Sequence, residues 1–572
     1  MQQSPEPNAD VDSITVEILT GKLLATVDEM GIIMTRTSMS PIVYEVLDFA
    51  CGICAPNGDL IAQSNGITLF TGTFAYQVRT LAARYKDDIA PGDIFVTNDP
   101  FAGGTHPNDV AVVRPIFVGD QLLAYAITVA HWLDIGGAVP GSLPVDATSI
   151  FQEGLRLPGI RIARDDKLND DLVRLIEENV RMPDLAMGDL RAQIATVRIA
   201  ERNLCDSAEK YGFETVSAAF DEITESSSKS SRRVIAELPD GVYEAEDLID
   251  GDGVTDDPIP VCVRVTIEGD SMTADFTGCA PTTAGPINCT RGALESAVKT
   301  VFKALVDPGA PSNEGWFSPL DVVVPEGTVF SANKPAPTGW YYEGSVHASE
   351  LVWRALAPLK PEQFSAGSYT SLSVLYLTGK KENGELFVHI EPQHGGWGAT
   401  SDRDGANALI ALTDGDTYNH SIELLEAKLP ILVRRYGFNT DGGVGAGRHR
   451  GGYGLIREYE MRTDEASFFC GISRNKTPPW GMDGGGVGSC NFVEVRTPGN
   501  DAPTRVHHHP DWHLERGDSV RVITGGGGAW GRPEDRLISD VQADIADGLI
   551  TIEEASQSYD LSPATLKMSK EK

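Results

Sequence analysis

The sequence is poor in cysteine, with eight in 572 residues. So few cysteines over such a length exclude the disulfide framework of a small secreted domain. Cys51 and Cys54 form the one C-x-x-C pattern, and no second pair accompanies it. The surrounding pattern predicts a strand, a turn at Asn57–Gly58 and a second strand, so the two thiols are expected on opposite faces of a strand. We interpret them as small buried side chains rather than as a redox or zinc pair.

Positive charge is scarce as well. Lys and Arg total 47 against 82 Asp and Glu, which gives a formal net charge of -35 at pH 7. Nucleic acids and anionic membranes need a cationic surface, so neither is expected as a partner. The sequence also lacks an apolar run long enough to cross a membrane. Its first residues, MQQSPEPNADVDS, lack the basic start and apolar core of a secretory signal, so we expect a cytoplasmic protein.

A length of 572 residues is too great for one compact core. Helical and strand patterns are mixed, so we expect a multidomain α+β (mixed α/β) protein. The predicted segments are an N-terminal α/β domain with the candidate site, a mixed α/β domain, a β-rich domain and a short helical tail, at residues 1–230, 231–430, 431–535 and 536–572. The first boundary rests on the serine-rich stretch Ser226–Ser231, which holds nothing that needs burial. At the start of the chain, a helical pattern that ends at Thr37 follows Asp12 as a predicted cap.

The stretch Asn98–Ser142 gathers the polar residues with the clearest chemistry. Two apolar runs, Val110–Phe117 and Leu122–Ala130, flank Gly119–Asp120. Two such runs around a Gly-Asp pair predict an antiparallel β-hairpin. One end of this hairpin then gathers His106, Asp109, His131 and Asp134.

Imidazoles and carboxylates at one strand end are a candidate site for a divalent metal. With the turn centred between Gly119 and Asp120, Asn108 lies opposite His131. Asp109 and His131 then point to opposite faces in an ideal register, so at least one must leave the ladder. Glycine pairs on either side of the hairpin make that bend feasible. The alternative is a hairpin whose end is polar without binding a metal, because H-x-x-D is a common pattern.

Six longer blocks carry a resemblance to a known family. They are NDPFAGGTHPNDVAVV, HWLDIGGAVPGS, GDLRAQIATVR, PSNEGW, RYGFNTDGGVGAGRHRGGYGLIREY and GDSVRVITGGGGAWGRPEDR. In these blocks the chain resembles the hydantoinase B/5-oxoprolinase family over nearly its whole length. The family includes B subunits of ATP-dependent hydantoin- and lactam-opening amidohydrolases, 5-oxoprolinases, and metal-bearing subunits of acetone- and acetophenone-type carboxylases.

The resemblance implies a partner, a hydantoinase A-like subunit that binds ATP and phosphorylates a carbonyl oxygen of the substrate. This chain, in a heterodimer or heterotetramer, is then expected to receive the activated species without binding ATP itself. The resemblance also implies a divalent metal held by Asp48, His106, Asp109 and His131. Two departures stand out. Many relatives carry an Arg-rich segment where this chain has Glu45–Leu47, and many carry His-His-Ala-Asp where it has His131–Asp134.

Two Asp and two His make a mixed nitrogen and oxygen ligand set. Such a set suits Zn²⁺, with Mn²⁺ or Fe²⁺ as alternatives, better than Ca²⁺ or Mg²⁺. A metal with an open position lowers the pKa of bound water towards ~7 and supplies hydroxide. His131 and Asp134 are the expected catalytic residues, with Asp134 orienting His131 or acting as a base. A cap or turn role for Asp134 is the alternative.

The expected function is the metal-dependent hydrolytic subunit of an ATP-dependent cyclic amide hydrolase, with a lactam, hydantoin or 5-oxoproline-like ring as substrate. A ketone carboxylase subunit is the first alternative, and a non-catalytic scaffold of the ATPase subunit is the second. His389, Glu391 and His394 (H-x-E-x-x-H) could make a second site, but we interpret them as pocket or loop residues. His507–His509 with His513 could bind a metal adventitiously, but we interpret them as a polar surface loop. The glycine run after Thr524 lacks the Lys-Ser/Thr of a P-loop. It predicts tight turns and close backbone packing between domains or subunits instead.

Overall fold

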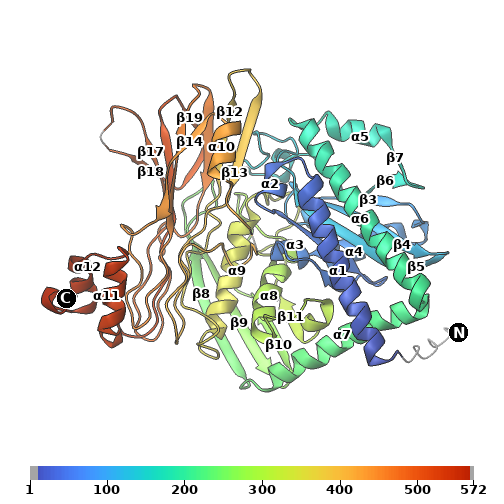
Figure 1. Ribbon diagram of the computed structural model, residues 1–572, viewed down its shortest axis with the longest axis horizontal. Coiled ribbons are helices and arrows are strands. Elements are labelled where there is room, and N and C mark those ends of the chain that lie inside the picture. The colour runs from blue at the N-terminus through green and yellow to red at the C-terminus, as the bar shows by residue number, and fades with distance from the viewer. Residues whose placement is uncertain (1–10, 416, 501, 567–572) are drawn as a thin grey trace, which may run out of the picture. The chain divides into compact units, whose positions relative to one another are not determined.

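A computed structural model describes residues 11–415, 417–500 and 502–566 (Figure 1). They form two compact units, each assembled from segments that are distant in sequence. The first unit extends to Tyr243 and adds Arg264–Tyr341 and Thr413–Tyr418. The second contains Glu244–Val263, Tyr342–Leu412 and the chain from Asn419 onward. The expected multidomain mixed α/β fold class is confirmed.

The division into two units differs from the four segments expected. The serine-rich stretch at 226–231 lies inside a helix, α7 (Phe213–Ala236), and not at a domain edge. Ser231 is buried there, and its hydroxyl donates to Trp316 O at 2.7 Å. Serine costs a helix interior only a fraction of a kcal/mol relative to good helix formers, so packing of the other residues outweighs its composition signal.

The core of the first unit is a seven-stranded sheet with the order β2-β1-β5-β4-β3-β6-β7. All its pairs are antiparallel. Its strands are β1 (Phe49–Cys54), β2 (Leu60–Gln63), β3 (Ile94–Thr97), β4 (Asp109–Val118), β5 (Gln121–His131), β6 (Ile160–Arg164) and β7 (Lys167–Leu168). Every residue of β1 is buried, so both faces of the sheet are covered at this strand.

Helices cover this sheet, and in Figure 1 α1 and α6 run alongside each other over it. Asp12 caps α1 by accepting from Ile14 N and Thr15 N, as predicted. The helices of the unit are α1 (Ser13–Thr37), α2 (Pro41–Tyr44), α3 (Thr68–Thr71), α4 (Phe74–Tyr85), α5 (Asp170–Glu177), α6 (Pro183–Tyr211), α7 and α8 (Arg291–Val306), with 3-10 turns η1 (Lys86–Asp88), η2 (Pro100–Ala102), η3 (Ile150–Gln152) and η4 (Glu314–Phe317). No helix among the described residues is both long and apolar enough to cross a membrane.

A second sheet has the order β11-β10-β9-β8. Its strands are β8 (Gly241–Ile249), β9 (Ile259–Glu268), β10 (Ser271–Asp275) and β11 (Leu320–Val323). The chain leaves the first unit within β8 and returns to it within β9.

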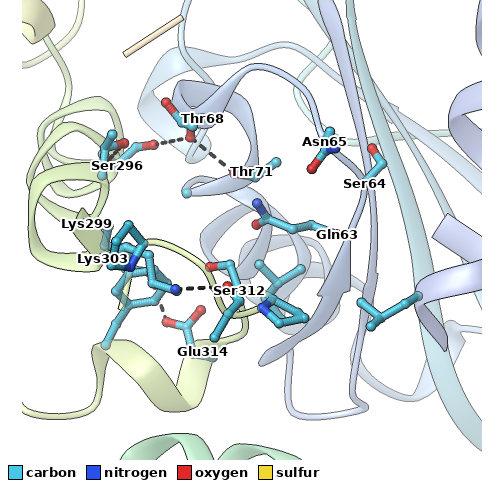
Figure 2. A pocket seen from close by; sticks show the side chains of 18 of the residues that line it. Gln63, Ser64, Asn65, Thr68, Thr71, Ser296, Lys299, Lys303, Ser312 and Glu314 are labelled. Carbon is cyan, nitrogen blue, oxygen red and sulfur yellow. Dashed lines mark hydrogen bonds and ion pairs between the residues drawn. The ribbon is translucent and has the colours of Figure 1, made fainter. Parts of the chain in front are cut away.

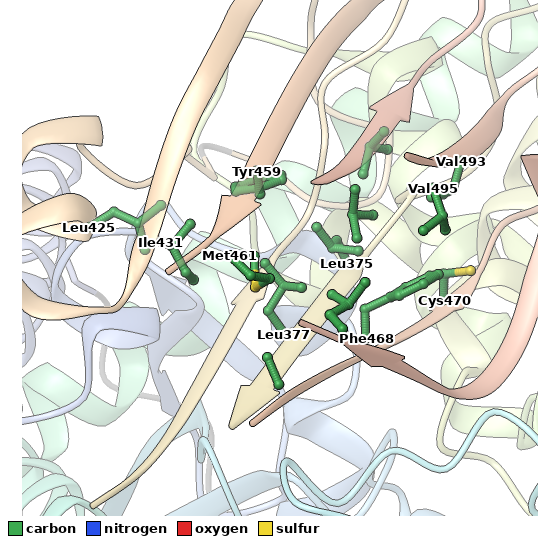
Figure 3. Packing of buried hydrophobic residues seen from close by; sticks show 14 of the residues in the cluster. Leu375, Leu377, Leu425, Ile431, Tyr459, Met461, Phe468, Cys470, Val493 and Val495 are labelled. Atoms are coloured by element: carbon green, nitrogen blue, oxygen red, sulfur yellow. The ribbon is translucent and has the colours of Figure 1, made fainter. Parts of the chain in front are cut away.

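The second unit is β-rich, as expected for the C-terminal region. Its two sheets have the orders β13-β12-β16-β19 and β14-β15-β20-β17-β18. Their strands are β12 (Leu375–Lys380), β13 (Leu386–Glu391), β14 (Ile431–Phe438), β15 (Leu455–Met461), β16 (Ala466–Gly471), β17 (Phe492–Arg496), β18 (Thr504–Val506), β19 (His508–Leu514) and β20 (Ser519–Ile523). One apolar core draws on both sheets, with Leu377 and Phe468 from one and Tyr459 and Val495 from the other (Figure 3). Burial of each such side chain contributes about 1.5–3 kcal/mol.

Helices complete this unit: α9 (Tyr341–Leu356, from its second residue), α10 (Ile422–Lys428), η5 (Pro533–Asp535), α11 (Ile538–Ala546), α12 (Ile552–Tyr559) and α13 (Pro563–Leu566). The short helical tail predicted from the sequence is therefore present. Its helices pack around a small core of their own that includes Val541 and Tyr559.

Glycine-rich segments of the second unit pack backbone against backbone. Gly396 N donates to Gly525 O at 3.0 Å, and Gly527 N donates to Gly452 O at 2.9 Å. A Cβ at Gly525 would lie 1.9 Å from Ser489 O, so no larger residue fits. Close backbone packing after Thr524 is therefore present, but it lies within the second unit and not between domains or subunits as predicted.

A buried carboxyl group on α9 makes the stability of the second unit depend on pH. Glu350 Oε1 accepts from Trp480 Nε1 at 2.8 Å and from Ser368 N at 3.3 Å, and burial raises the pKa of Glu350 to about 7. The folded state therefore holds this proton more tightly than the unfolded chain. The resulting stabilisation is complete below the ordinary pKa of 4.5 and is lost as the pH rises through about 7.

We expect the change Glu350→Gln to flatten the pH profile of stability in this window, by at most ~1.4 kcal/mol per pH unit. Denaturant unfolding of both proteins at several pH values between the two pKa values measures the difference. Glutamine keeps an acceptor for Trp480 but does not titrate. Parallel profiles for the two proteins would contradict the prediction.

Candidate metal centre

The predicted hairpin is present, with a two-residue turn at Gly119–Asp120 between β4 and β5. Its register at the candidate site differs by one residue from the expected one. A β-bulge between Ile116 and Phe117 shifts the pairing, so that Asp109 lies directly opposite His131. Directly paired residues share a face of the sheet, so neither residue has to leave the ladder.

Asp48 reaches the same end of the sheet from the start of β1. This strand pairs with β5, with Phe49 opposite Ala130, and Asp48 O accepts from His131 N at 3.1 Å. The preceding residue, Leu47, has a φ of 66°, a left-handed conformation that costs a non-glycine residue roughly 1–2 kcal/mol. Pairing of the strands on either side holds this turn in place.

Three side chains that could each supply a metal-ligand atom converge where β4 begins and β5 ends. Asp109 Oδ1 lies 2.9 Å from His106 Nε2 and 3.1 Å from His131 Nδ1, and the two ring nitrogens are 3.2 Å apart. Asp48 Oδ2 lies 4.0 Å from His131 Nδ1. The structure thus brings together three of the four residues expected as metal ligands, His106, Asp109 and His131, and places Asp48 next to His131.

The four side chains differ in their access to solvent. His106, Asp109 and His131 expose 3%, 1% and 6% of their side chains, whereas Asp48 exposes 22%. Asp48 therefore marks the accessible side of the cluster.

The second carboxylate oxygen of Asp109 is held by two hydroxyl groups. Thr105 Oγ1 donates to Asp109 Oδ2 at 2.5 Å, and Tyr341 OH donates to the same oxygen at 3.3 Å. These bonds leave Oδ1 directed at the two imidazoles. Sequence reasoning singled out neither hydroxyl donor. Tyr341 lies far away in the chain, and no spacing pattern connects it to the hairpin.

A chain of hydrogen bonds fixes the ring of His106. Its Nδ1 donates to Gly339 O at 2.8 Å, since a carbonyl oxygen can only accept, and Nε2 is then the atom that faces Asp109. Glu153 in turn accepts from Gly339 N at 2.7 Å and from Thr338 N at 2.9 Å. Glu153 is buried, and burial raises its pKa to about 7. It is a positioning residue that acts on His106 through the backbone of Gly339.

Carboxyl groups crowd the cluster. Removal from water, and then repulsion by Asp109 and Asp414, raise the pKa of Asp48 well above its usual value. Burial, with a smaller contribution from Asp109, raises the pKa of Asp414 to about 7. Burial also raises the pKa of Asp109, but the charges and hydrogen bonds of the nearby His106 and His131 outweigh burial, so the pKa of this carboxyl group lies below its usual value. A bound cation would offset the mutual repulsion of these carboxylates.

The two imidazoles differ in their affinity for a proton. Burial opposes protonation of His106, but the charge and hydrogen bond of Asp109 outweigh burial and raise its pKa. For His131 burial outweighs the same carboxylate and lowers the pKa. His131 is therefore the more readily neutral ring of the two, with Nδ1 directed at Asp109.

Asp414 comes from a short segment, Thr413–Tyr418, that belongs to the first unit although its neighbours in the chain belong to the second. Leu69 N and Thr68 Oγ1 donate to Thr413 O at 3.3 and 2.7 Å. At the other end of the segment, Tyr418 N donates to Val46 O at 3.1 Å. These bonds tie the segment to the start of α3 and to the turn that precedes β1, and no pattern in the sequence indicated this.

Asp134, expected to orient His131, has other partners. Its Oδ1 accepts from Gly136 N at 3.0 Å and from Arg181 N at 2.8 Å, and its Oδ2 accepts from Gly141 N and Arg181 Nη1, both at 3.0 Å. Among the described residues, no hydrogen bond or ion pair joins Asp134 to His131. The carboxylate instead closes the loop after β5, which corresponds to the alternative turn role.

Trp132, where many relatives carry a second His, turns away from the cluster. Its indole is fully buried, and Nε1 donates to Gln193 Oε1 on α6 at 3.0 Å. Gln193 Nε2 donates in turn to Val110 O at 2.8 Å. These hydrogen bonds connect α6 to the hairpin, which carries Asp109 and His131.

The other candidate residues from the sequence are buried or are paired with neighbouring side chains. Cys51 and Cys54 are buried free thiols, and burial raises the pKa of each. Glu391 binds the buried Arg457, with Oε1 2.9 Å from Nη1, and His389 Nε2 lies 3.3 Å from its other oxygen. His394 instead binds Asn419 through Nδ1 at 2.7 Å. The H-x-E-x-x-H pattern therefore does not bring its three side chains to one point.

A polar hollow of about 460 Å³ lies elsewhere in the first unit, and none of the four cluster residues lines it. Figure 2 shows Gln63, Asn65 and Thr71 around it, opposite Lys299. Lys299 Nζ is paired with Glu314 Oε1 at 2.9 Å. The hollow is thus distinct from the cluster, and Lys299, one of the two lysines that line it, is neutralised within the fold.

We expect the change Glu153→Ala to weaken metal binding by roughly 10–100-fold, because partners of ligating histidines typically contribute this much. Loss of Glu153 frees the backbone of Gly339 and with it the ring of His106. Titration of metal-stripped protein with Zn²⁺ against a competing chelator measures the affinity. Glu153→Gln, which keeps an acceptor, is the matched control and is expected to recover most of the affinity. Unchanged affinity in the alanine variant would contradict the positioning role.

Comparison with known proteins identifies the family. The family model Hydantoinase B/oxoprolinase matches residues 12–533, so the chain belongs to this family. Over 566 residues it is 32% identical to the putative B subunit of a D-/L-hydantoinase from a Pseudomonas species, with 96% of this chain and 95% of the relative aligned.

Solved structures agree with this assignment. The ATP-dependent caprolactamase from Pseudomonas jessenii matches with a TM-score of 0.89 at 26% identity, over 96% of each chain. An acetone carboxylase structure matches with a TM-score of 0.88 at 20% identity, over 96% of this chain and 80% of that one. The second likeness shows a shared fold alone.

Proposed function

We propose that this chain is the metal-dependent hydrolytic subunit of an ATP-dependent cyclic amide hydrolase. Its substrate class is a lactam, hydantoin or 5-oxoproline-like ring, activated by a separate hydantoinase A-like subunit that binds ATP. The observation that carries the proposal is the convergence of His106 Nε2, His131 Nδ1 and Asp109 Oδ1 within 3.2 Å of one another. The names of the hydantoinase and caprolactamase relatives support the substrate class.

The donor set fits a divalent transition metal. His106, Asp109 and His131 each offer one buried donor atom, and Asp48 offers a carboxylate on the accessible side. Two imidazoles and two carboxylates favour Zn²⁺, Mn²⁺ or Fe²⁺. When bound, such an ion lowers the pKa of a water molecule towards ~7 and so provides hydroxide at neutral pH.

The residues around the cluster orient the side chains that would hold the metal. Asp109 supplies negative charge between the two imidazoles, and Thr105 and Tyr341 keep its carboxylate in one orientation. Glu153 and Gly339 fix the proton of His106 on Nδ1. We assign the chemistry to this cluster and assign Asp134 to the loop that follows β5.

A division of labour between two subunits has a chemical reason. An amide carbonyl in an unstrained ring is a poor electrophile, and phosphorylation of its oxygen makes the carbon far more reactive. The partner would carry out this activation with ATP. The glycine run after Thr524, which lacks the Lys-Ser/Thr of a P-loop, supports placing ATP in the partner.

Co-expression with a hydantoinase A-like partner tests the proposal. ATP turnover is measured with lactams and hydantoins, and in parallel with a ketone plus bicarbonate. We expect turnover and ring-opened product in the first arm. Turnover only in the ketone arm would replace the proposal with the carboxylase alternative. Elemental analysis of the purified complex provides a second readout, and full activity in chelator without bound metal would favour the scaffold alternative.

A further inference from the structure

A second group of metal-ligating side chains lies in the second unit, away from the hairpin. Asp256 belongs to the loop between β8 and β9, His507 lies between β18 and β19, and His508 is the first residue of β19. Each offers one ligand atom, and these atoms all lie within 4.8 Å of one another. Asp256 and His507 are 251 positions apart in the chain, so the fold and not local sequence brings them together.

The backbone explains how two consecutive histidines reach the same point. Neighbouring residues of a regular strand point to opposite faces. His507, however, occupies the single-residue gap between β18 and β19, where the strand is interrupted, and its carbonyl accepts from Ile472 N at 3.0 Å. The two rings lie 5.4 Å apart with an interplanar angle of 80°. His507 Nε2 is 3.1 Å from Asp256 Oδ1.

His508 carries a buried ring nitrogen without a partner. Its Nδ1 is shielded from solvent and has no hydrogen-bond partner among the described residues. An unpaired buried polar atom destabilises the fold, so this nitrogen needs a structural reason. Burial lowers the pKa of His508 to about 4, which leaves the ring neutral and able to ligate at neutral pH. A hydrogen bond from His507 lowers the pKa of Asp256, which keeps the carboxylate ionised.

We propose that Asp256, His507 and His508 bind a second divalent transition metal ion such as Zn²⁺. Two imidazoles and one carboxylate are a ligand set of intermediate softness, with room for a fourth ligand from solvent at the exposed Asp256. This site is separate from the cluster of His106, Asp109 and His131 and does not depend on the proposed function.

The surroundings suit a structural ion. Lys476 Nζ donates to Asp256 O at 2.9 Å and to Asp250 O at 3.2 Å, and so holds the β8–β9 loop by its backbone. The same ammonium group lies 4.0 Å from Asp256 Oδ1, and Asp252 adds negative charge near His508. A metal at this point would fasten the β8–β9 loop to the start of β19, and the gain in order is expected in that loop.

Metal titration of the full chain tests the proposal. In the Asp109→Asn background, which removes the hairpin cluster, we expect one equivalent of Zn²⁺ to bind. His507→Gln and Asp256→Asn each change a solvent-accessible donor, so both variants are expected to fold, and each should weaken this binding by at least roughly tenfold. Substitution with Co²⁺ should give the visible absorption of a site with nitrogen ligands in the background protein and not in the two variants.

Exposed His513 on β19 provides the matched control. His513→Gln should leave stoichiometry and affinity unchanged, and Zn²⁺ should slow hydrogen exchange in the loop at 250–258 only when the three donors are intact. Equal losses in His513→Gln and His507→Gln would show adventitious binding to surface histidines and overturn the proposal. So would a failure of the Asp109→Asn protein to bind any Zn²⁺ at micromolar concentration.

Discussion

Replacing Asp109 with Asn is expected to lower both metal affinity and ring-opening activity by more than about 100-fold. Even partners of metal ligands typically contribute 10–100-fold, and Asp109 is itself the carboxylate between the two imidazoles. Asparagine keeps the size of the side chain and can still accept from Thr105 and Tyr341, so the fold should survive. Elemental analysis and single-turnover product formation, with the partner subunit and ATP present, measure the two effects.

The control for this change lies in the same hairpin. Asp120→Asn alters the same functional group in the exposed turn between β4 and β5 and should leave metal content and activity unchanged. ATP binding by the partner subunit should be the same with either variant. If the Asp109→Asn complex kept both its metal and its activity, the hairpin cluster would not be the reaction centre.

The change Glu391→Gln is expected to destabilise the second unit by about 3–5 kcal/mol, the usual consequence of removing one partner from a buried ion pair. Arg457 is fully buried, and Glu391 is its anion at 2.9 Å. Glu391 also accepts from His420 N at 2.6 Å and from Tyr459 OH. Without this charge the guanidinium remains uncompensated in the interior. Denaturant unfolding, followed by fluorescence, measures the loss.

The exposed pair Lys381–Glu385 provides the comparison for this prediction. Glu385→Gln removes a surface ion pair and should change stability by less than about 1 kcal/mol. Metal stoichiometry should be unaffected by Glu391→Gln. Loss of a bound metal in that variant, with stability unchanged, would mean that the H-x-E-x-x-H pattern is a metal site after all.

Local patterns in the sequence were enough to place the hairpin and its polar end. Alternation and a Gly-Asp pair predicted β4, β5 and the turn between them, and the family resemblance added Asp48. The register was wrong by one residue, because nothing in the pattern marks the bulge at Ile116–Phe117. That bulge decides whether Asp109 and His131 share a face, so the geometry of the site was beyond pattern reading.

Contacts between residues that are distant in the sequence also could not be predicted from local patterns. Tyr341, Gly339 and Asp414 approach the cluster from segments far along the chain, and their spacing carries no periodic signal. Composition misled at Ser226–Ser231, where polar residues sit within a long packed helix. Asp134 lies three residues after His131, and this spacing indicated a chemical role. Its oxygens instead accept from Gly141 N and from Arg181 Nη1.

The assignment of Thr413–Tyr418 to the first unit has a consequence for how the protein is made. The nascent chain completes Asp48, His106, Asp109 and His131 early in synthesis. The segment with Asp414, tied to the start of α3 and to the turn before β1, emerges only after the second unit's first strands have been translated. The ribosome therefore synthesises two segments of the second unit, Glu244–Val263 and Tyr342–Leu412, before the last segment of the first unit is complete.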